Sequence, residues 1–299
     1  MEAIWQWGIN FIMAIQQVHG PGPDSIFRGI TFLGEEQFYL LLLPLILWCF
    51  DYSFGAVLAV FFLLSNSLNV MLKDLLQQPR PFNLNPGLRL SQATGYGLPS
   101  GHAQLSVTVW GAVADRVQRP WFWALTVVLM LLIGFSRVYL GVHFPTDVLA
   151  GWIIAAILLA CYIMFSSRMG KWLAGLDLGF QLLLAAGVPI LLLVPDPAIE
   201  GLTNSGTLFG VGVGLVFASR YVPFSAQGRW WKRLVRFLVG IIVLLALYLG
   251  LKAVFPPDGS AAGAIGRFLR YALVGGWVVI GAPWLFRLMR LVETRRSMP

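Results

Sequence analysis

The sequence FGAVLAVFFLLSNSLNVMLKDLLQQPRP, residues 54–81, begins as a continuous apolar run and ends in a polar cluster. Apolar runs recur along the chain, and a helix that spans a bilayer needs about 20 such residues. Of the 299 residues, 58% are hydrophobic and 11% are charged, whereas roughly 25% are charged in soluble domains. A β-barrel would alternate apolar and polar residues instead. The sequence therefore predicts an all-α, polytopic membrane protein.

Nine segments are long and apolar enough to be predicted as transmembrane helices. They lie at about 34–50, 54–76, 101–118, 121–140, 145–165, 178–195, 204–221, 234–254 and 265–288. Residues 2–18 mix apolar and polar positions at helical spacing, which predicts a helix in the membrane interface. Glycines spaced four apart at Gly206, Gly210 and Gly214 predict close packing between helices.

Basic residues are distributed unequally between alternate loops. One set of loops, with the C-terminal tail, holds 13 of the 21 basic residues: Arg116, Arg119, Arg168, Lys171, Arg220, Arg229, Lys232, Arg233, Arg236, Arg287, Arg290, Arg295 and Arg296. The positive-inside rule places this side in the cytoplasm. The same alternation puts three polar clusters, at residues 73–81, 99–102 and 136–147, together on the extracytoplasmic side.

The remaining composition argues against other partners. The net charge of +8 is no evidence for a nucleic-acid partner, because the position of basic residues matters more than their sum in a membrane protein. Cys49 and Cys161 both fall in apolar runs, which indicates neither a disulfide nor a zinc site. His19 lies beside a Gly/Pro break and is interpreted as an exposed loop residue.

The first polar cluster holds two cations. Lys73 and Arg80 are seven residues apart, about two helical turns, so both can point the same way if the helix continues to Gln78. Pro79 then ends the helix. A Lys and a conformationally limited Arg can bind a tetrahedral dianion, although cations at helix ends also extend to lipid head groups.

The second cluster, Pro99-Ser100-Gly101-His102, directly precedes an apolar run. Ser100 is a favourable helix cap, and the backbone N–H groups that follow it can bind an anion at the positive helix end. Gly101 allows a ligand to approach the backbone closely. His102 would then lie beside the bound group. A helix cap with an incidental histidine is the alternative for this motif alone.

The third cluster runs from Ser136-Arg137 to Asp147. Pro145 suits the first position of a helix, and residues four apart, such as His143 and Asp147, meet on a helix. An Asp bonded to one imidazole nitrogen fixes the tautomer and leaves the other nitrogen free to attack. Ionisable residues inside a membrane indicate a functional site. Together the three clusters predict a site for a phosphate-like anion.

The three clusters also resemble a known signature. Lys-(six residues)-Arg-Pro, Pro-Ser-Gly-His and Ser-Arg-(five residues)-His-(three residues)-Asp occur in this order and without gaps over residues 70–150. They resemble the signature of the type 2 phosphatidic acid phosphatase superfamily, which includes glucose-6-phosphatase, sphingosine-1-phosphate phosphatases, undecaprenyl-diphosphate phosphatases and vanadium haloperoxidases. The number of predicted spans and the stretch after Gly206 look more like the glucose-6-phosphatase and sphingosine-1-phosphate phosphatase branches.

This resemblance implies a hydrolysis in two steps, without metal or other cofactor. His143 would attack phosphorus to form a phosphohistidine, and Asp147 would orient it. His102 would protonate the leaving alcohol and then activate water. The implied substrate is an amphiphilic lipid phosphate or diphosphate from the bilayer, with a soluble sugar phosphate as the alternative. An anion transporter is an alternative of another class.

The resemblance also assigns the phosphate-binding groups. Lys73, Arg80 and Arg137 would hold the phosphoryl oxygens, helped by Ser100 and the backbone at Gly101. We expect one membrane domain over residues 1–299, with a catalytic core at about 34–166 and additional helices at about 178–290. The loop at 82–98, which contains Arg89, is expected near the mouth of the site. The expected location is the bacterial inner membrane.

Overall fold

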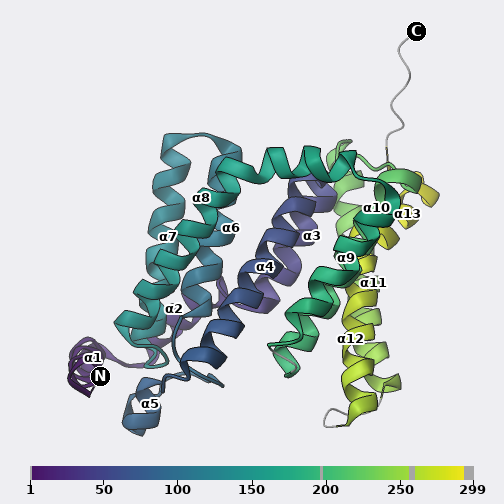
Figure 1. Cartoon of the computed structure of the whole chain (residues 1–299). Coiled ribbons are helices and arrows are strands. Elements are labelled where there is room, and N and C mark those ends of the chain that lie inside the picture. The colour runs from purple at the N-terminus through teal and green to yellow at the C-terminus, as the bar shows by residue number, and fades with distance from the viewer. Residues whose placement is uncertain (1, 196–197, 256–259, 293–299) are drawn as a thin grey trace. The chain divides into compact units, whose positions relative to one another are not determined.

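A computed structural model describes residues 2–195, 198–255 and 260–292, and all regular structure in these ranges is helical (Figure 1). The chain forms two compact units. The first contains the described residues up to Tyr39 together with Leu68–Ser167, and the second contains Leu40–Ser67 and the described residues from Arg168 onward. The expected single domain over residues 1–299 stays a prediction.

The first unit contains the N-terminal helices and the helices around the three polar clusters. Its complete helices are α1 (Glu2–Ile15), the 3₁₀ turn η1 (Gln16–Val18), α2 (Pro21–Phe32), α5 (Pro81–Leu84), the 3₁₀ turn η2 (Pro86–Leu88), α6 (Gly101–Val117) and α7 (Pro120–Tyr139). Three helices run from one unit into the other: α3 (Glu36–Cys49), α4 (Tyr52–Leu76) and α8 (Pro145–Gly175).

The second unit contains the remaining helices. They are α9 (Leu178–Leu192), α10 (Ile199–Tyr221), α11 (Trp230–Val254), α12 (Ala261–Gly276), the π-helical segment η3 (Trp277–Gly281) and α13 (Ala282–Leu288). The carbonyls of η3 accept hydrogen bonds from aromatic side chains, from Trp48 Nε1 to Val278 at 2.8 Å and from the Tyr52 hydroxyl to Val279 at 2.6 Å. These donors satisfy backbone groups that π-helical geometry displaces from the regular helical pattern.

The protein is an integral membrane protein, but the predicted count of nine spans is not confirmed. Six helical segments of the described chain are long and apolar enough to cross a membrane: Tyr52–Leu84, Pro120–Tyr139, Pro145–Gly175, Ile199–Tyr221, Trp230–Val254 and Ala261–Leu288. The count becomes seven if α2 and α3, which are bent by 44° at their junction, form one span.

The three other predicted spans are not confirmed, because their helices are short. α3, α9 and α6 contain 14, 15 and 17 residues. At about 1.5 Å per residue, such helices reach about 21–26 Å, less than the roughly 30 Å of a hydrocarbon core. The apolar runs at 34–50, 101–118 and 178–195 are helical, as predicted, whereas their prediction as complete spans is not confirmed.

Glycines join α10 to α12, as the spacing of Gly206, Gly210 and Gly214 predicted. A Cβ atom added to Gly210 would overlap the carbonyl group of Ala272, and one added to Gly214 would lie 2.6 Å from a methyl group of Val279. Only glycine allows the two helices to approach this closely.

We expect Gly210→Ala to destabilise the second unit by about 1–3 kcal/mol, because the added methyl group forces backbone apart. Thermal unfolding of the purified protein in detergent measures the effect. The matched control is Gly250→Ala in α11, where an added Cβ meets no atom within 4 Å. Equal melting temperatures for the two variants would contradict the close contact.

Candidate active site

The first polar cluster leaves α4 earlier than predicted. The helix ends at Leu76, so the condition that it continues to Gln78, under which both cations would point the same way along one helix, is not met. Gln77 has a left-handed φ of 48° and turns the chain before Pro79 is reached. Lys73 therefore lies in the last turn of α4, whereas Arg80 lies outside it and precedes α5 in extended conformation.

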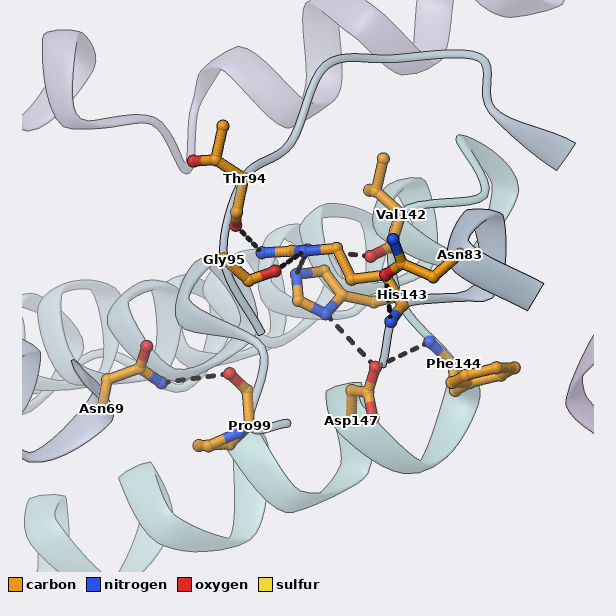
Figure 2. A network of polar contacts seen from close by, with 10 residues as sticks. Asn69, Asn83, Thr94, Gly95, Pro99, Val142, His143, Phe144 and Asp147 are labelled. Carbon is orange, nitrogen blue, oxygen red and sulfur yellow. Dashed lines mark hydrogen bonds and ion pairs between the residues drawn. The ribbon is translucent and has the colours of Figure 1, made fainter. Parts of the chain in front are cut away.

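The guanidinium of Arg80 is held by two loops, whose residues Thr94, Gly95 and Val142 are labelled in Figure 2. Its Nε donates to the Gly95 carbonyl at 2.9 Å and its Nη2 to the Thr94 carbonyl at 2.7 Å. Its Nη1 lies 2.9 Å from the Val142 carbonyl and 3.1 Å from His143 Nε2. The residue is 3% exposed. Arg80 is thus fixed in place against the ring of His143.

These contacts determine the tautomer of His143. A guanidinium has only donors, so His143 Nε2 must be the acceptor and carries a lone pair. The proton then lies on Nδ1, which faces Asp147 Oδ2 at 3.4 Å, a long hydrogen bond (Figure 2). The same carboxylate oxygen accepts the Phe144 N–H at 2.9 Å. The predicted contact between His143 and Asp147 is therefore present, and α8 begins at Pro145 as predicted.

A glycine makes the turn before His143 possible. Gly141 has a φ of 69°, a left-handed conformation that only glycine adopts without strain. A Cβ atom on this residue would also overlap the Leu88 carbonyl. The turn therefore requires glycine for two reasons, and it carries the chain from the end of α7 to the imidazole.

The second cluster joins the third through the backbone. The Ser100 N–H donates to the Asp147 carbonyl at 3.0 Å. Ser100 occupies the N-cap position of α6, but its hydroxyl makes no capping hydrogen bond, contrary to our expectation. Lys73 approaches the same turn, since a Cβ atom on Gly101 would lie 3.8 Å from its Nζ. All three clusters therefore meet in the first unit.

Three buried polar atoms of the site make no hydrogen bond to the part of the chain that the structure describes. They are Ser100 Oγ, His102 Nε2 and Arg137 Nε. Leaving a buried donor or acceptor unsatisfied costs about 1–3 kcal/mol, so a partner is expected. Arg137 is otherwise anchored by donating from Nη1 to Thr31 Oγ1 at 2.6 Å. A tetrahedral oxyanion offers the acceptors that this arrangement lacks.

The charges around His143 favour its neutral form. Burial lowers the pKa of His143 well below its ordinary 6.5, and the nearby charges of Arg80, Arg137 and Lys73 lower it further. A neutral imidazole with its lone pair on Nε2 can act as a nucleophile. The surrounding cations favour an anionic ligand.

We expect His143 to stay neutral as the pH falls below 6.5, because its pKa is lowered. The chain contains three histidines, so NMR of protein labelled with ¹⁵N-histidine can assign each ring by single substitution. Protonation of His143 with a midpoint at or above its ordinary 6.5 would contradict the burial and charge at this position.

Some residues of the site escaped the sequence analysis. Asn69 donates to Gln104 Oε1 at 2.8 Å and to the Pro99 carbonyl at 3.4 Å, which supports the turn before α6 (Figure 2). It lies one helical turn before Lys73, and an amide in an apolar run was the available signal. No sequence signal indicated Thr31, the partner of Arg137, or the carbonyls that hold Arg80. The described residues contain no group of three or more His, Cys, Asp and Glu side chains placed to hold a metal ion.

Two sequence models of one family match the chain. The model of the PAP2 superfamily matches residues 54–170, which include all three clusters, and that of the PAP2 superfamily phosphatase transmembrane extension matches residues 202–295. Among solved structures, a PAP2 type phosphatidylglycerolphosphate phosphatase from Bacillus subtilis is similar, with a TM-score of 0.50 and 25% identity. The match covers 56% of this chain and 88% of that one.

Curated relatives match over different lengths. Sphingosine-1-phosphate phosphatase 2 of Mus musculus is 36% identical over 143 residues, which are 45% of this chain and 40% of the relative. Glucose-6-phosphatase 3 of Rattus norvegicus is 25% identical, and the match covers 98% of both chains. The chain spans less than half the length of the sphingosine-1-phosphate phosphatase that it matches. With both family models matched and the three motifs assembled in one place, the chain belongs to the PAP2 superfamily.

Proposed function

We propose that the protein is an integral membrane phosphatase that hydrolyses a lipid phosphate monoester or diphosphate through a phosphohistidine. The observation that carries the proposal is the contact of Arg80 Nη1 with His143 Nε2 at 3.1 Å, which places a guanidinium beside an imidazole lone pair. The names of two relatives, a sphingosine-1-phosphate phosphatase and a phosphatidylglycerolphosphate phosphatase, support a lipid substrate.

In the first step, His143 Nε2 attacks phosphorus and the bond from phosphorus to the substrate oxygen breaks. His102 gives a proton to that oxygen, which leaves as the alcohol. In the second step, His102 takes a proton from water, and the resulting hydroxide attacks the phosphohistidine. The bond between phosphorus and nitrogen breaks, phosphate is released, and His143 regains its lone pair. Asp147 holds the Nδ1 proton throughout and stabilises the positive charge that develops on the ring.

The remaining predicted residues act on the phosphoryl oxygens. Lys73, Arg80 and Arg137 neutralise their charge, while Ser100 and the backbone N–H groups at Gly101 donate to them. Phosphoryl transfer depends mostly on positioning and on neutralising this charge. The unpartnered donors of Ser100 and Arg137 support these roles, because bound oxygens would satisfy them.

We propose an extracytoplasmic active site and a cytoplasmic C-terminus in the bacterial inner membrane. The support is the excess of Lys and Arg in alternate loops, which marks the cytoplasmic side. Under this proposal the substrate enters from the bilayer, and residues 1–299 act as one membrane domain. Its catalytic core lies at about 34–166, and the helices at about 178–290 extend it.

A substrate panel with the purified protein tests the proposed activity. We expect phosphate release from phosphatidate, sphingosine phosphate or undecaprenyl diphosphate, unchanged by a metal chelator. Glucose 6-phosphate is included because the match to glucose-6-phosphatase 3 covers 98% of both chains. Hydrolysis of the sugar phosphate alone would replace the lipid substrate. Uptake of phosphate by vesicles without any hydrolysis would favour an anion transporter.

A further inference from the structure

A cavity of about 360 Å³ lies in the first unit, apart from the residues of the proposed mechanism. It is lined by Arg28, Arg89, Leu90, Ser91 and Gln92. Arg28 comes from α2 and the other residues come from the loop at 82–98. Two guanidinium groups at one cavity favour an anionic ligand, in particular a phosphate, which an arginine fork binds with two parallel hydrogen bonds.

Both guanidinium groups are held in position by hydrogen bonds that leave other N–H donors available. Arg28 Nη2 donates to the Leu90 carbonyl at 3.0 Å. Arg89 donates from Nε to the Ser91 carbonyl at 3.3 Å and from Nη2 to Gln92 Oε1 at 2.7 Å, and it stacks 4.6 Å above the ring of Phe82. Since a guanidinium has five N–H donors, most donors stay available. A preorganised group loses less entropy when it binds.

No carboxylate forms an ion pair with either arginine among the residues that the structure describes. Asp24, one helical turn before Arg28, interacts with it electrostatically and also accepts a hydrogen bond from the Tyr139 hydroxyl at 2.7 Å. The two guanidinium groups outnumber this one carboxylate, so the cavity keeps an excess of positive charge. An anion would neutralise it.

Two connections link the cavity to the catalytic groups. The Leu90 N–H donates to the Leu140 carbonyl at 3.1 Å, and Leu140 lies between Arg137 and His143 in the chain. Arg28 also lies one helical turn before Thr31, which accepts from Arg137. Residues three apart on a helix are neighbours on its surface, with Cβ atoms about 5–6 Å apart. The cavity therefore adjoins the two segments that carry Arg137 and its partner Thr31.

We propose that this cavity binds a second phosphate group in the head group of the substrate. The inference rests on the proposed function and narrows it: the preferred substrate carries the scissile phosphate monoester and another phosphate separated from it by a short linker. A lipid with one phosphate would be hydrolysed without using the cavity. The arginines would therefore set specificity and leave the chemical step unchanged.

The test compares two lipids with the same acyl chains. Phosphatidate carries one phosphate, and phosphatidylglycerophosphate carries a monoester and a phosphodiester separated by glycerol. In uncharged detergent micelles, we expect Arg28→Gln and Arg89→Gln each to lower kcat/KM for the second lipid about 10-fold or more, as for the loss of hydrogen bonds to a charged group. For phosphatidate, kcat/KM should change less than about 2-fold, because exposed charges at a distance are screened.

Two further variants serve as controls. Arg119→Gln removes an exposed arginine between α6 and α7 and should change neither substrate. Arg89→Lys keeps the charge but loses the fork, and should recover part of the loss. Equal losses for both lipids, or no loss for the phosphatidylglycerophosphate, would overturn the proposal. If the variants lose kcat/KM only after phosphatidylglycerol is added to the micelles, and equally for both substrates, the cavity binds a membrane lipid. That result would also overturn the proposal.

Binding separates this inference from the proposed function. Calorimetric titration of the same variants with the two lipids does not depend on turnover. Weaker binding of phosphatidylglycerophosphate alone, in Arg28→Gln and Arg89→Gln, would support the cavity even if the protein released no phosphate. Absence of release by the wild-type protein would count against the phosphatase function only. Unchanged binding of both lipids would refute the cavity as a head-group site.

Discussion

Replacing His143 with alanine should reduce phosphate release by about 10⁴-fold or more, as the loss of a nucleophile does in other enzymes. The imidazole supplies the lone pair on Nε2, and its Nδ1 faces Asp147. Alanine leaves the cations in place, so the substrate can still bind. Initial rates of phosphate release from the best lipid of the panel measure the effect, and rapid acid-free quenching with ³²P-labelled lipid measures the phosphohistidine.

The matched control for this variant is His19→Ala, which removes an exposed histidine beyond η1. It should retain both the rate and the labelled intermediate. Thermal unfolding of the two variants checks that His143→Ala still folds. Full activity of a folded His143→Ala protein would remove the proposed nucleophile. Labelling that persists in His143→Ala would instead indicate that the label is not on His143.

The sequence predicted which polar clusters lie together better than it predicted the number of spans. Spacing within a motif carries local geometry: a histidine four residues before an aspartate, with Pro145 between them, specifies a helix start and a contact across one turn. The contact is present at 3.4 Å, although His143 lies two residues before the start of α8. The length of a membrane span cannot be predicted from residue spacing in this way. The helix in 178–195 stops at Leu192 after 15 residues, although its composition is as apolar as that of longer helices.

The residues that the sequence did not reveal act through the backbone or through a distant helix. Arg80 is held by the carbonyls of Thr94 and Gly95, and every residue of the chain carries a backbone carbonyl, so residue type gives no signal. Gln77 ends α4 through a left-handed φ, which no residue pattern before Pro79 required. Thr31 meets Arg137 across 106 positions of the chain. Such contacts depend on tertiary packing, and spacing cannot predict them.

Arg80→Gln should lower kcat/KM about 10³-fold or more, which is the range for an arginine that neutralises a phosphoryl group in the transition state. Glutamine cannot replace four hydrogen bonds and a charge at once. Loss of the guanidinium would also leave the carbonyls of Thr94, Gly95 and Val142 without this donor. The effect on rate should therefore be accompanied by a lower melting temperature, and both are measured on the purified protein.

Arg80→Lys separates charge from geometry at this position. A lysine keeps the positive charge, but it is a point donor that cannot reach two loops, the imidazole and a phosphoryl oxygen together. We expect it to recover less than about 10-fold of the rate lost in Arg80→Gln, since fork geometry and not charge alone positions the oxygens. The control is Arg119→Gln, an exposed arginine at the start of α7, which should keep the wild-type rate.

The titration of His143 tests whether Arg80 also acts on the nucleophile. Burial is the main cause of the lowered pKa of His143, and the charge of Arg80 is the next. Removing that charge in Arg80→Gln should therefore raise the pKa of His143 toward its ordinary 6.5, while burial keeps it below that value. Arg80→Lys should leave it closer to wild type. A pKa that is unchanged in Arg80→Gln, together with a wild-type rate, would show that the contact at 3.1 Å has no part in catalysis.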